Sequence, residues 1–212
     1  PQFQSTVRPD KVASGILEGM IGVLIDNSPF VLMLPTTLNS FFQAADDYYN
    51  RWEIVTFTRI IRYVAAFLTV ALPGLYIAIA NYQSEMIPTA LALSFAAARE
   101  GVPFSVVFEV IIMEVAFELL REGGIRLPGH MGNTIGIVGG LIIGDAAVSA
   151  NIVSPIIVIV VALTAVASFT IPNEEFATAF RLSRYLVIGL SAWLGLYGFI
   201  CAVVLILIHL SS

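Results

Sequence analysis

Apolar stretches separated by short polar turns make up the chain from about residue 59 onward. Five of them are long enough to cross a hydrocarbon core of about 30 Å as α-helices that rise about 1.5 Å per residue. The pattern therefore predicts about five transmembrane helices, at residues 60–82, 104–122, 131–150, 152–171 and 185–210.

A sixth apolar stretch, residues 87–98, is too short to cross a membrane alone. It ends at Arg99-Glu100-Gly101-Val102-Pro103, a sequence that favours the end of a helix. We therefore predict a half-helix that is re-entrant or lies at the membrane interface. Within the first span, Pro73 and Gly74 are expected to produce a kink.

The first 58 residues show a different pattern. Two short apolar runs flank the turn-forming residues 26–29, which predicts a hairpin. Three aromatic residues stand beside three arginines, as expected for an aromatic belt with basic anchors at a membrane surface: Tyr48, Tyr49 and Trp52 with Arg51, Arg59 and Arg62. We therefore expect an all-α membrane protein in which residues 1–58 form an interfacial elbow, with a hairpin and an amphipathic helix, and residues 59–212 form the transmembrane helical domain.

The composition supports a membrane protein and excludes several other classes. Hydrophobic residues make up 58% of the 212 residues and charged residues 12%, about half the charged share of an average soluble domain. The net charge of −5 and the single lysine, Lys11, provide no basic surface for nucleic acid. Cys201 is the only cysteine, so neither a disulfide framework nor a cysteine-based zinc site is expected.

No motif of a soluble enzyme occurs in the sequence, so we expect no catalytic residue, no metal and no cofactor, and we predict that the protein is not an enzyme. The chain begins at Pro1 without an initiator methionine or a signal peptide, so we expect it to be part of a longer protein.

The arginines at the start of the first span, together with Arg121 and Arg126, favour a cytoplasmic location for these turns. Arg181 and Arg184 agree with that side if they lie in the loop before the last span.

Carboxylates on the helix predicted at residues 104–122 are candidates for a buried charge network. One face of this helix carries Glu114, Glu118, Arg121 and Glu122, whereas Glu109 lies about 140° away from Glu114. Glu118 can pair with Arg121 at the i, i+3 spacing, so Glu114 and Glu109 need partners on other helices or subunits. Such a network either clamps helices in register or contributes to a conducting path.

The helix predicted at residues 131–150 has two distinct faces. Glycine recurs at every fourth position, and small residues at this spacing let helices in a membrane approach closely; these glycines are Gly132, Gly136, Gly140 and Gly144. The opposite face is polar at both ends and apolar in the middle, with Thr134, Val138, Leu141, Asp145 and Ser149. Repeated around a ring of helices, it would provide a carboxylate ring and a hydrophobic constriction, as in a gated pore. The alternative is that this face packs on the next span, with Asp145 bonded to a neighbour.

Motifs along nearly the whole chain resemble the membrane domain of the A subunit of bacterial spore germinant receptors (the GerA family), or its stage V sporulation paralogue. The motifs that carry the resemblance are Arg8-Pro9-Asp10-Lys11, Asp26-Asn27-Ser28-Pro29-Phe30, Phe41-Phe42-Gln43, Asp47-Tyr48-Tyr49, Glu85-Met86-Ile87-Pro88, Arg99-Glu100-Gly101-Val102-Pro103-Phe104, Met113-Glu114, Phe117-Glu118-Leu119-Leu120-Arg121-Glu122, Arg126-Leu127-Pro128, Ile137-Val138-Gly139-Gly140 and Ile143-Gly144-Asp145-Ala146-Ala147-Val148. The chain departs from the family pattern at two turns, Gly123-Gly124 and Gly129-His130.

The resemblance implies a multi-pass subunit in the spore inner membrane that acts with a transporter-like B subunit and a lipoprotein C subunit. It also implies a homo-oligomeric ring, a pentamer, that conducts cations when nutrients bind the B subunit. Two alternatives remain from the residues alone. One is a secondary transporter, although the sequence contains no internal repeat. The other is a non-conducting scaffold subunit of a receptor complex.

Overall fold

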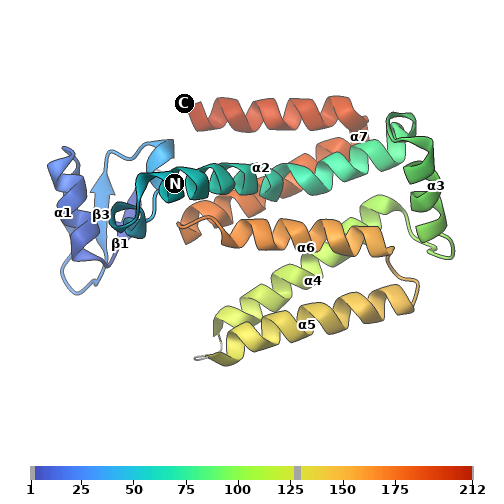
Figure 1. The fold of residues 1–212 in the computed structure, drawn as a ribbon, viewed down its shortest axis with the longest axis horizontal. Helices are drawn as coiled ribbons and strands as arrows, with labels where there is room; N and C mark the ends of the chain where they lie inside the picture. Colours follow the sequence, from blue (N-terminus) through green and yellow to red (C-terminus); the bar gives the residue numbers. More distant parts are fainter. Residues whose placement is uncertain (1–2, 127–129, 212) are drawn as a thin grey trace. The chain divides into compact units, whose positions relative to one another are not determined.

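The computed structural model describes residues 3–126 and 130–211, and it is mostly helical (Figure 1). The chain divides into two compact units. The first contains Pro1–Phe67 and Ala167–Leu182, and the second contains Leu68–Val166 and Ser183–Ser212. Helices α2 and α7 each begin in the first unit and end in the second.

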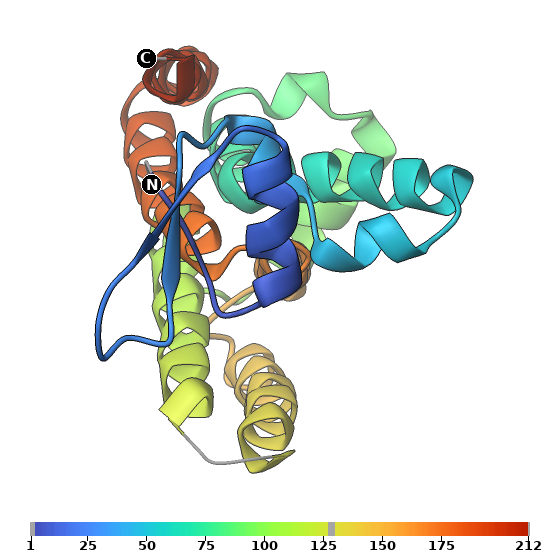
Figure 2. The same ribbon diagram turned by 90° about the vertical axis from the view of Figure 1, so that its left-hand side faces the viewer.

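A three-stranded antiparallel sheet forms the centre of the first unit (Figure 2). Its strands are β1 (Gln4–Thr6), β2 (Ile21–Leu24) and β3 (Val31–Leu34), in the order β1-β3-β2. β2 and β3 form the predicted hairpin, with Gly22 opposite Met33. The all-α prediction is therefore wrong for this region, because β1 adds a third strand whose pattern is too short to be recognised from the sequence.

Helix α1 (Pro9–Leu17) packs on one face of this sheet. Pro9 is favourable at the first helical position, and the acidic Asp10 follows it in the first turn. Gly15 permits the close approach to β3, because a Cβ there would overlap the Cε of the buried Met33.

Two 3-10 helices, η1 (Leu38–Phe42) and η2 (Ala45–Tyr49), connect the sheet to α2 (Trp52–Tyr82). Aromatic contacts fix η1 to the start of α7 (Glu174–Ser211) within the same unit. The ring of Phe176 is stacked on Phe41 at 5.0 Å between centroids and meets Phe42 edge-on at 5.3 Å. Such pairs contribute about 0.5–1.5 kcal/mol beyond the burial of their area.

Asp47 in η2 binds the first turns of α2. Arg62 Nη1 and Nη2 donate to its two carboxylate oxygens at 2.7 and 2.9 Å, and Arg59 Nε donates at 3.3 Å. The backbone N–H of Ala44 adds a further bond at 3.2 Å. Arg59 and Arg62 were predicted as membrane anchors, but the structure pairs both of them with Asp47. The aromatic residues predicted for the belt are exposed: Tyr48, Tyr49 and Trp52.

Asp47→Asn is expected to lower the free energy of unfolding by about 2 kcal/mol at neutral pH, because two arginines lose their carboxylate partner. Burial raises the pKa of Asp47. Hydrogen bonds from Arg62, Ala44 and Arg59 lower the pKa by more than burial raises it, so the resulting pKa is below the ordinary value. A group with a lowered pKa stabilises the folded state fully above its unfolded pKa, about 3.9, and this contribution is lost as the pH falls through the folded-state pKa.

Thermal unfolding midpoints of the wild type and Asp47→Asn, measured from neutral pH down to about pH 3, test this prediction. The difference should be constant above about pH 5 and shrink below about pH 4. Asp46→Asn is the matched control, because Asp46 is exposed and its pair with Arg8 at 3.1 Å should contribute at most about 1 kcal/mol. Equal losses for the two variants would contradict the assignment to Asp47.

The second unit consists of helices and their connections. After α2 come η3 (Ser84–Met86), α3 (Thr89–Ala98), α4 (Val106–Arg126), α5 (His130–Ser149), α6 (Pro155–Phe169) and the later part of α7. Five of these α-helices correspond to the predicted spans, and α3 corresponds to the predicted half-helix. The clearest difference is α2, which begins at Trp52 rather than at residue 60 and continues through Pro73.

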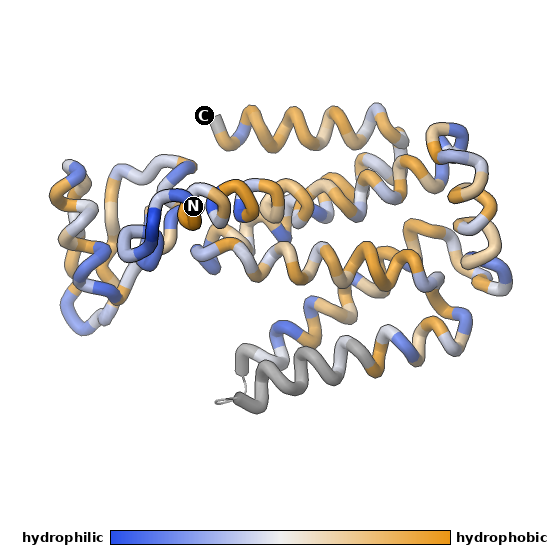
Figure 3. Tube along the Cα trace, in the orientation of Figure 1, coloured by the Kyte–Doolittle hydropathy of each residue, from blue (hydrophilic) through white to orange (hydrophobic). Residues whose placement is uncertain are grey.

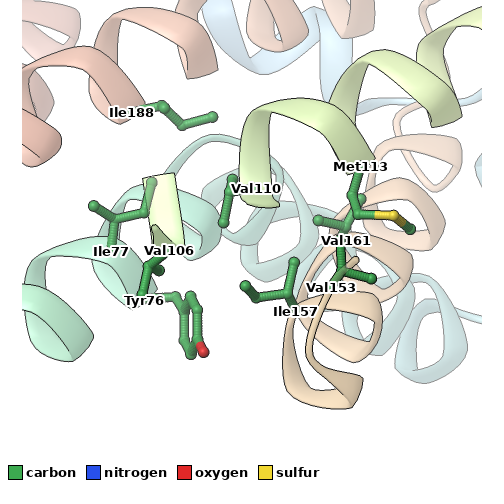
Figure 4. Close-up of a cluster of buried hydrophobic side chains, with 9 residues drawn as sticks. All are labelled: Tyr76, Ile77, Val106, Val110, Met113, Val153, Ile157, Val161 and Ile188. Carbon is green, nitrogen blue, oxygen red and sulfur yellow. The ribbon is translucent and has the colours of Figure 1, made fainter. Parts of the chain in front are cut away.

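A cluster of buried side chains from four helices and the α5–α6 turn forms the core of this unit (Figure 4). α2, α4, α6 and α7 contribute to it, with Tyr76, Ile77, Val106, Val110, Met113, Val153, Ile157, Val161 and Ile188. β-branched side chains predominate, and their fixed shapes suit tight helix contacts. Gly74 brings α2 close to α7, because a Cβ there would lie 2.7 Å from Val187 Cγ1.

Helix α7 is broken at Gly195, which has φ 62° and ψ −138°. Figure 1 shows the chain reversing within α7, so that its last part runs back along the unit. The hydroxyl of Tyr82 donates to the carbonyls of Ala192 and Trp193 at 2.7 and 3.3 Å. These carbonyls lie at the end of the part of α7 that precedes Gly195, where the helix supplies no partner for them. The predicted span 185–210 is therefore interrupted at Gly195.

Within residues 3–126 and 130–211, two helices are long and apolar enough to cross a membrane by length and composition, namely α2 and α7. Figure 3 shows apolar residues along α2, α6 and α7, and hydrophilic residues gathered at η2. α3 and α6 are apolar but shorter. Five membrane crossings remain a prediction.

Candidate functional site

Charged side chains of α4 are buried in the second unit, and each of them binds a different neighbour. Glu109 is fully buried in the first turn of α4. Its Oε1 accepts a hydrogen bond from Arg99 Nη2 at 3.1 Å, and its Oε2 accepts one from the backbone N–H of Ser154 at 2.8 Å. Because Arg99 follows α3 and Ser154 precedes α6, this one carboxylate joins three helices.

The contact with Ser154 also has an electrostatic basis. The first backbone N–H groups of a helix have no partner within the helix, and they carry the positive end of its dipole. Ser154 lies immediately before the first residue of α6, so Glu109 provides both an acceptor and a negative charge at that end. This arrangement explains how a carboxylate can be fully buried in an apolar core.

Glu114, one and a half turns further along α4, forms the most buried ion pair among the described residues. Its Oε2 lies 2.6 Å from Arg184 Nη2 in α7, and the two side chains are 1% and 3% exposed. The Oε1 of Glu114 and the Nε of Arg184 are buried without a hydrogen-bond partner in the described part of the chain. The pair is therefore strong in charge attraction but incompletely satisfied.

Arg184 was not predicted as the partner of Glu114, because it was expected in the loop before the last span. The structure places Arg181 and Arg184 inside α7 instead. A signal was present in the sequence: an arginine followed by a long apolar run is expensive in a membrane unless it has a partner. Glu114, for which the sequence offered no partner on its own helix, is the residue that pairs with Arg184. Spacing within one helix cannot show which residues of two different helices will meet.

Glu118 and Arg121 form a pair within the same helix. Arg121 Nη1 is 3.6 Å from Glu118 Oε2, at the predicted i, i+3 spacing. The Glu118 side chain is 39% exposed, so its charge remains in contact with the surroundings of the unit. This pair is much weaker than the one formed by Glu114.

Helix α5 lies antiparallel to α4, and the views in Figures 1 and 2 agree on this pairing. Two glycines of the predicted stripe contact neighbouring helices. A Cβ at Gly140 would lie 3.4 Å from Phe117 of α4, and one at Gly144 would lie 3.2 Å from Val158 of α6. The surroundings of the other two predicted glycines, Gly132 and Gly136, lie outside the described part of the structure.

The opposite face of α5 carried the predicted pore residues. Asp145 and Ser149 are both exposed in the second unit, together with Ile142. The side chains of the other three predicted residues, Thr134, Val138 and Leu141, lie outside the described residues. Their role in a pore therefore stays a prediction.

These contacts define a mostly helical protein in which buried ion pairs join apolar helices, two of them of membrane-spanning length. The family model described as Bacillus/Clostridium GerA spore germination protein matches residues 1–212. The chain therefore belongs to the GerA spore germination protein family, as its motifs had indicated.

Several relatives have a spore germination role in their names. The chain is 46% identical over 211 residues to spore germination protein A1 of Bacillus subtilis (strain 168), which covers 100% of the chain and 44% of that protein. It is 47% identical over 212 residues to spore germination protein KA of the same strain, with 100% and 39% covered. A third relative in that strain, YfkQ, is 43% identical over 210 residues, covers 99% of the chain and 41% of its own length, and is described as an uncharacterized membrane protein.

The chain thus spans less than half the length of each of these relatives. No solved structure matches the chain significantly.

Proposed function

We propose that this chain is the membrane-spanning part of a germinant receptor A subunit, and that copies of it form a cation channel in the spore inner membrane. Membership of the family supports the role in germination. The length and composition of α2 and α7, and the description of one relative as a membrane protein, support the membrane location. The proposed role is ion transport rather than catalysis.

One observation carries the channel proposal: α5 exposes a carboxylate. Asp145 is exposed while Gly140 and Gly144 on the other face contact α4 and α6. A carboxylate on a membrane helix is costly against lipid, so it faces water or another polar partner. A ring of α5 helices would give Asp145 a water-filled lumen and would favour cations there.

The proposed ring is a homo-oligomer, with five copies as the family resemblance implies. The B and C subunits of a germinant receptor are its proposed partners, and a signal from them would open the pore. In this arrangement Thr134, Val138, Leu141, Asp145 and Ser149 line the path. Val138 and Leu141 form its hydrophobic constriction, which closes by excluding water.

Reconstitution of the purified protein into liposomes, with single-channel recording, tests the proposal. Val138→Ser should admit water into the constriction and give a leaky channel, whereas Val138→Phe should keep it closed. Asp145→Asn should weaken the preference for cations and leave assembly unchanged. Gly140→Leu is the matched control on the other face, and it should disrupt helix packing and assembly instead.

Three results would contradict this proposal. Slow flux without single steps would favour a transporter, and no flux at all would favour a scaffold subunit. In addition, cysteines placed at positions 134, 138, 141 and 145 should react with water-soluble thiol reagents in the open state. If only cysteines on the glycine face reacted, the assignment of the two faces of α5 would be wrong.

A further inference from the structure

A pocket opens in the first unit between α1 and the 3-10 helices η1 and η2, far along the chain from α5. Its volume is about 210 Å³. The buried Met33 and Gly15 are among the residues that line it. Polar groups surround it, including Lys11, Ser14 and Glu18 of α1 and its C-cap. Water occupies about 30 Å³ per molecule, so the pocket has room for a small organic molecule.

Lys11 provides a positive charge at one end of this pocket. Its ammonium group forms no hydrogen bond or ion pair with the part of the chain that the structure describes. Asp10 is not available to it, because Arg8 holds both oxygens of that carboxylate at 3.2 and 2.8 Å. Burial lowers the pKa of Lys11, and the nearby Arg8 lowers it further, while Asp10 raises it. The charge of Lys11 is therefore poorly compensated within the protein.

Glu18 provides a negative charge at the other end. Lys11, Ser14 and Glu18 follow the i, i+3, i+7 spacing of one helix face, which separates the two charged residues by about 10 Å along the axis. Glu18 Oε1 lies 3.4 Å from the hydroxyl of Tyr48, which also lies 3.3 Å from Gln43 Oε1. These are long contacts, so Glu18 can still accept a hydrogen bond from a cation.

Both charges oppose the dipole of α1. Lys11 lies in the first turn, near the positive end of the helix, and Glu18 lies at the C-cap, near the negative end. Each placement is unfavourable for the stability of the isolated helix. A bound molecule with the opposite pattern would be attracted by the side chain at each end and by the helix dipole as well.

We propose that this pocket binds a small, extended zwitterion with the chemistry of a short peptide, whose carboxylate lies at Lys11 and whose ammonium group lies at Glu18. An extended chain covers about 3.3 Å per residue, so a peptide of about three residues matches the separation of the two charges. Ser14 and Gln43 also line the pocket and offer hydrogen-bonding groups. This site is separate from the proposed pore and does not depend on it.

Nuclear magnetic resonance can test the proposal directly, because Lys11 is the only lysine in the chain. Incorporation of ¹³Cε-labelled lysine gives a single side-chain signal at the proposed site. Triglycine, as the probe, should shift this signal in a saturable way in the detergent-solubilised protein. N-acetyl-triglycine amide, which carries no charge, should leave the signal unchanged.

Glu18→Gln should raise the half-saturating concentration of triglycine by about tenfold, as expected for the loss of one charge-assisted contact. Glu53→Gln is the matched control, because Glu53 is exposed and does not line the pocket; it should change that concentration by less than about twofold. Thermal midpoints show whether each variant folds. If Glu18→Gln does not fold, Glu18→Ala replaces it, because it also removes the carboxylate.

Three outcomes would overturn the proposal: no shift with triglycine at millimolar concentration, an equal shift with the uncharged peptide, or equal effects of the Glu18 and Glu53 variants. A shift produced only by vesicles that contain phosphatidylethanolamine would also overturn it, because the zwitterion would then be a lipid headgroup rather than a peptide.

Discussion

Arg184→Met is expected to lower the free energy of unfolding of the second unit by about 3–5 kcal/mol. The exchange removes the partner of Glu114, which then remains buried without compensation for its charge. Methionine fills much of the volume of arginine, so the loss reflects the unpaired carboxylate more than a cavity. Thermal unfolding of the detergent-solubilised protein, followed by size-exclusion chromatography, measures this change.

A double-mutant cycle separates the charge effect from other effects of the substitution. Glu114→Leu should also be strongly destabilising, because it leaves Arg184 as an unpaired buried cation. The double variant Glu114→Leu with Arg184→Met should recover most of the loss, since an apolar pair can replace a buried ion pair at little cost. A double variant as unstable as the sum of the single variants would contradict the pairing.

Glu118→Gln is the matched control, one turn further along α4. Its side chain is 39% exposed and its contact with Arg121 is longer, at 3.6 Å. We therefore expect a loss of at most about 1 kcal/mol. If this variant lost as much stability as Arg184→Met, the two pairs would not differ in the way their burial indicates.

The helical part of the fold could be predicted from the sequence because long apolar runs between turns specify helices locally. α3, α4, α5 and α6 accordingly appear close to their predicted positions. The first unit was harder to predict. α1 is only nine residues long, and β1 is a three-residue strand of polar residues that is recognised only from its pairing with β3.

Partners across helices were the main part of the site that the sequence could not provide. The i, i+3 spacing was sufficient to place Arg121 beside Glu118, because both residues lie on one helix. Glu109 and Glu114 find Arg99 and Arg184 only through the tertiary arrangement. The break in α7 was missed for a related reason: a glycine in an apolar run is tolerated in membrane helices, so Gly195 gave no specific signal.

Gly195→Ala is expected to destabilise the broken form of α7 by about 2–5 kcal/mol. Two physical effects contribute. At φ 62° and ψ −138° the backbone adopts a conformation that residues with side chains rarely occupy. In addition, the new Cβ would lie 2.9 Å from Cγ and 3.1 Å from Cβ of Tyr82, atoms close to the backbone of α2 that cannot easily move.

Gly189→Ala in the same helix is the matched control. No atom lies within 4 Å of the Cβ that this substitution would add, so it should be neutral or stabilising by up to about 1 kcal/mol. Tyr82→Phe tests the second contact at the break, because it removes the hydrogen bonds to the carbonyls of Ala192 and Trp193 while keeping the ring. A loss of about 1 kcal/mol is expected from that variant.

Spin labels show whether α7 remains broken in the Gly195→Ala variant. Cys201 is the only cysteine, and the exposed Leu186→Cys supplies the second label. In an unbroken helix these positions would lie about 22 Å apart along the axis, whereas the reversal at Gly195 brings them closer. The wild-type background should give the shorter distance, and Gly195→Ala should either shift the distribution toward the longer one or lower the thermal midpoint. If the variant kept both the short distance and the wild-type midpoint, Gly195 would not be required for the break, and the chain reversal would have to be attributed to packing alone.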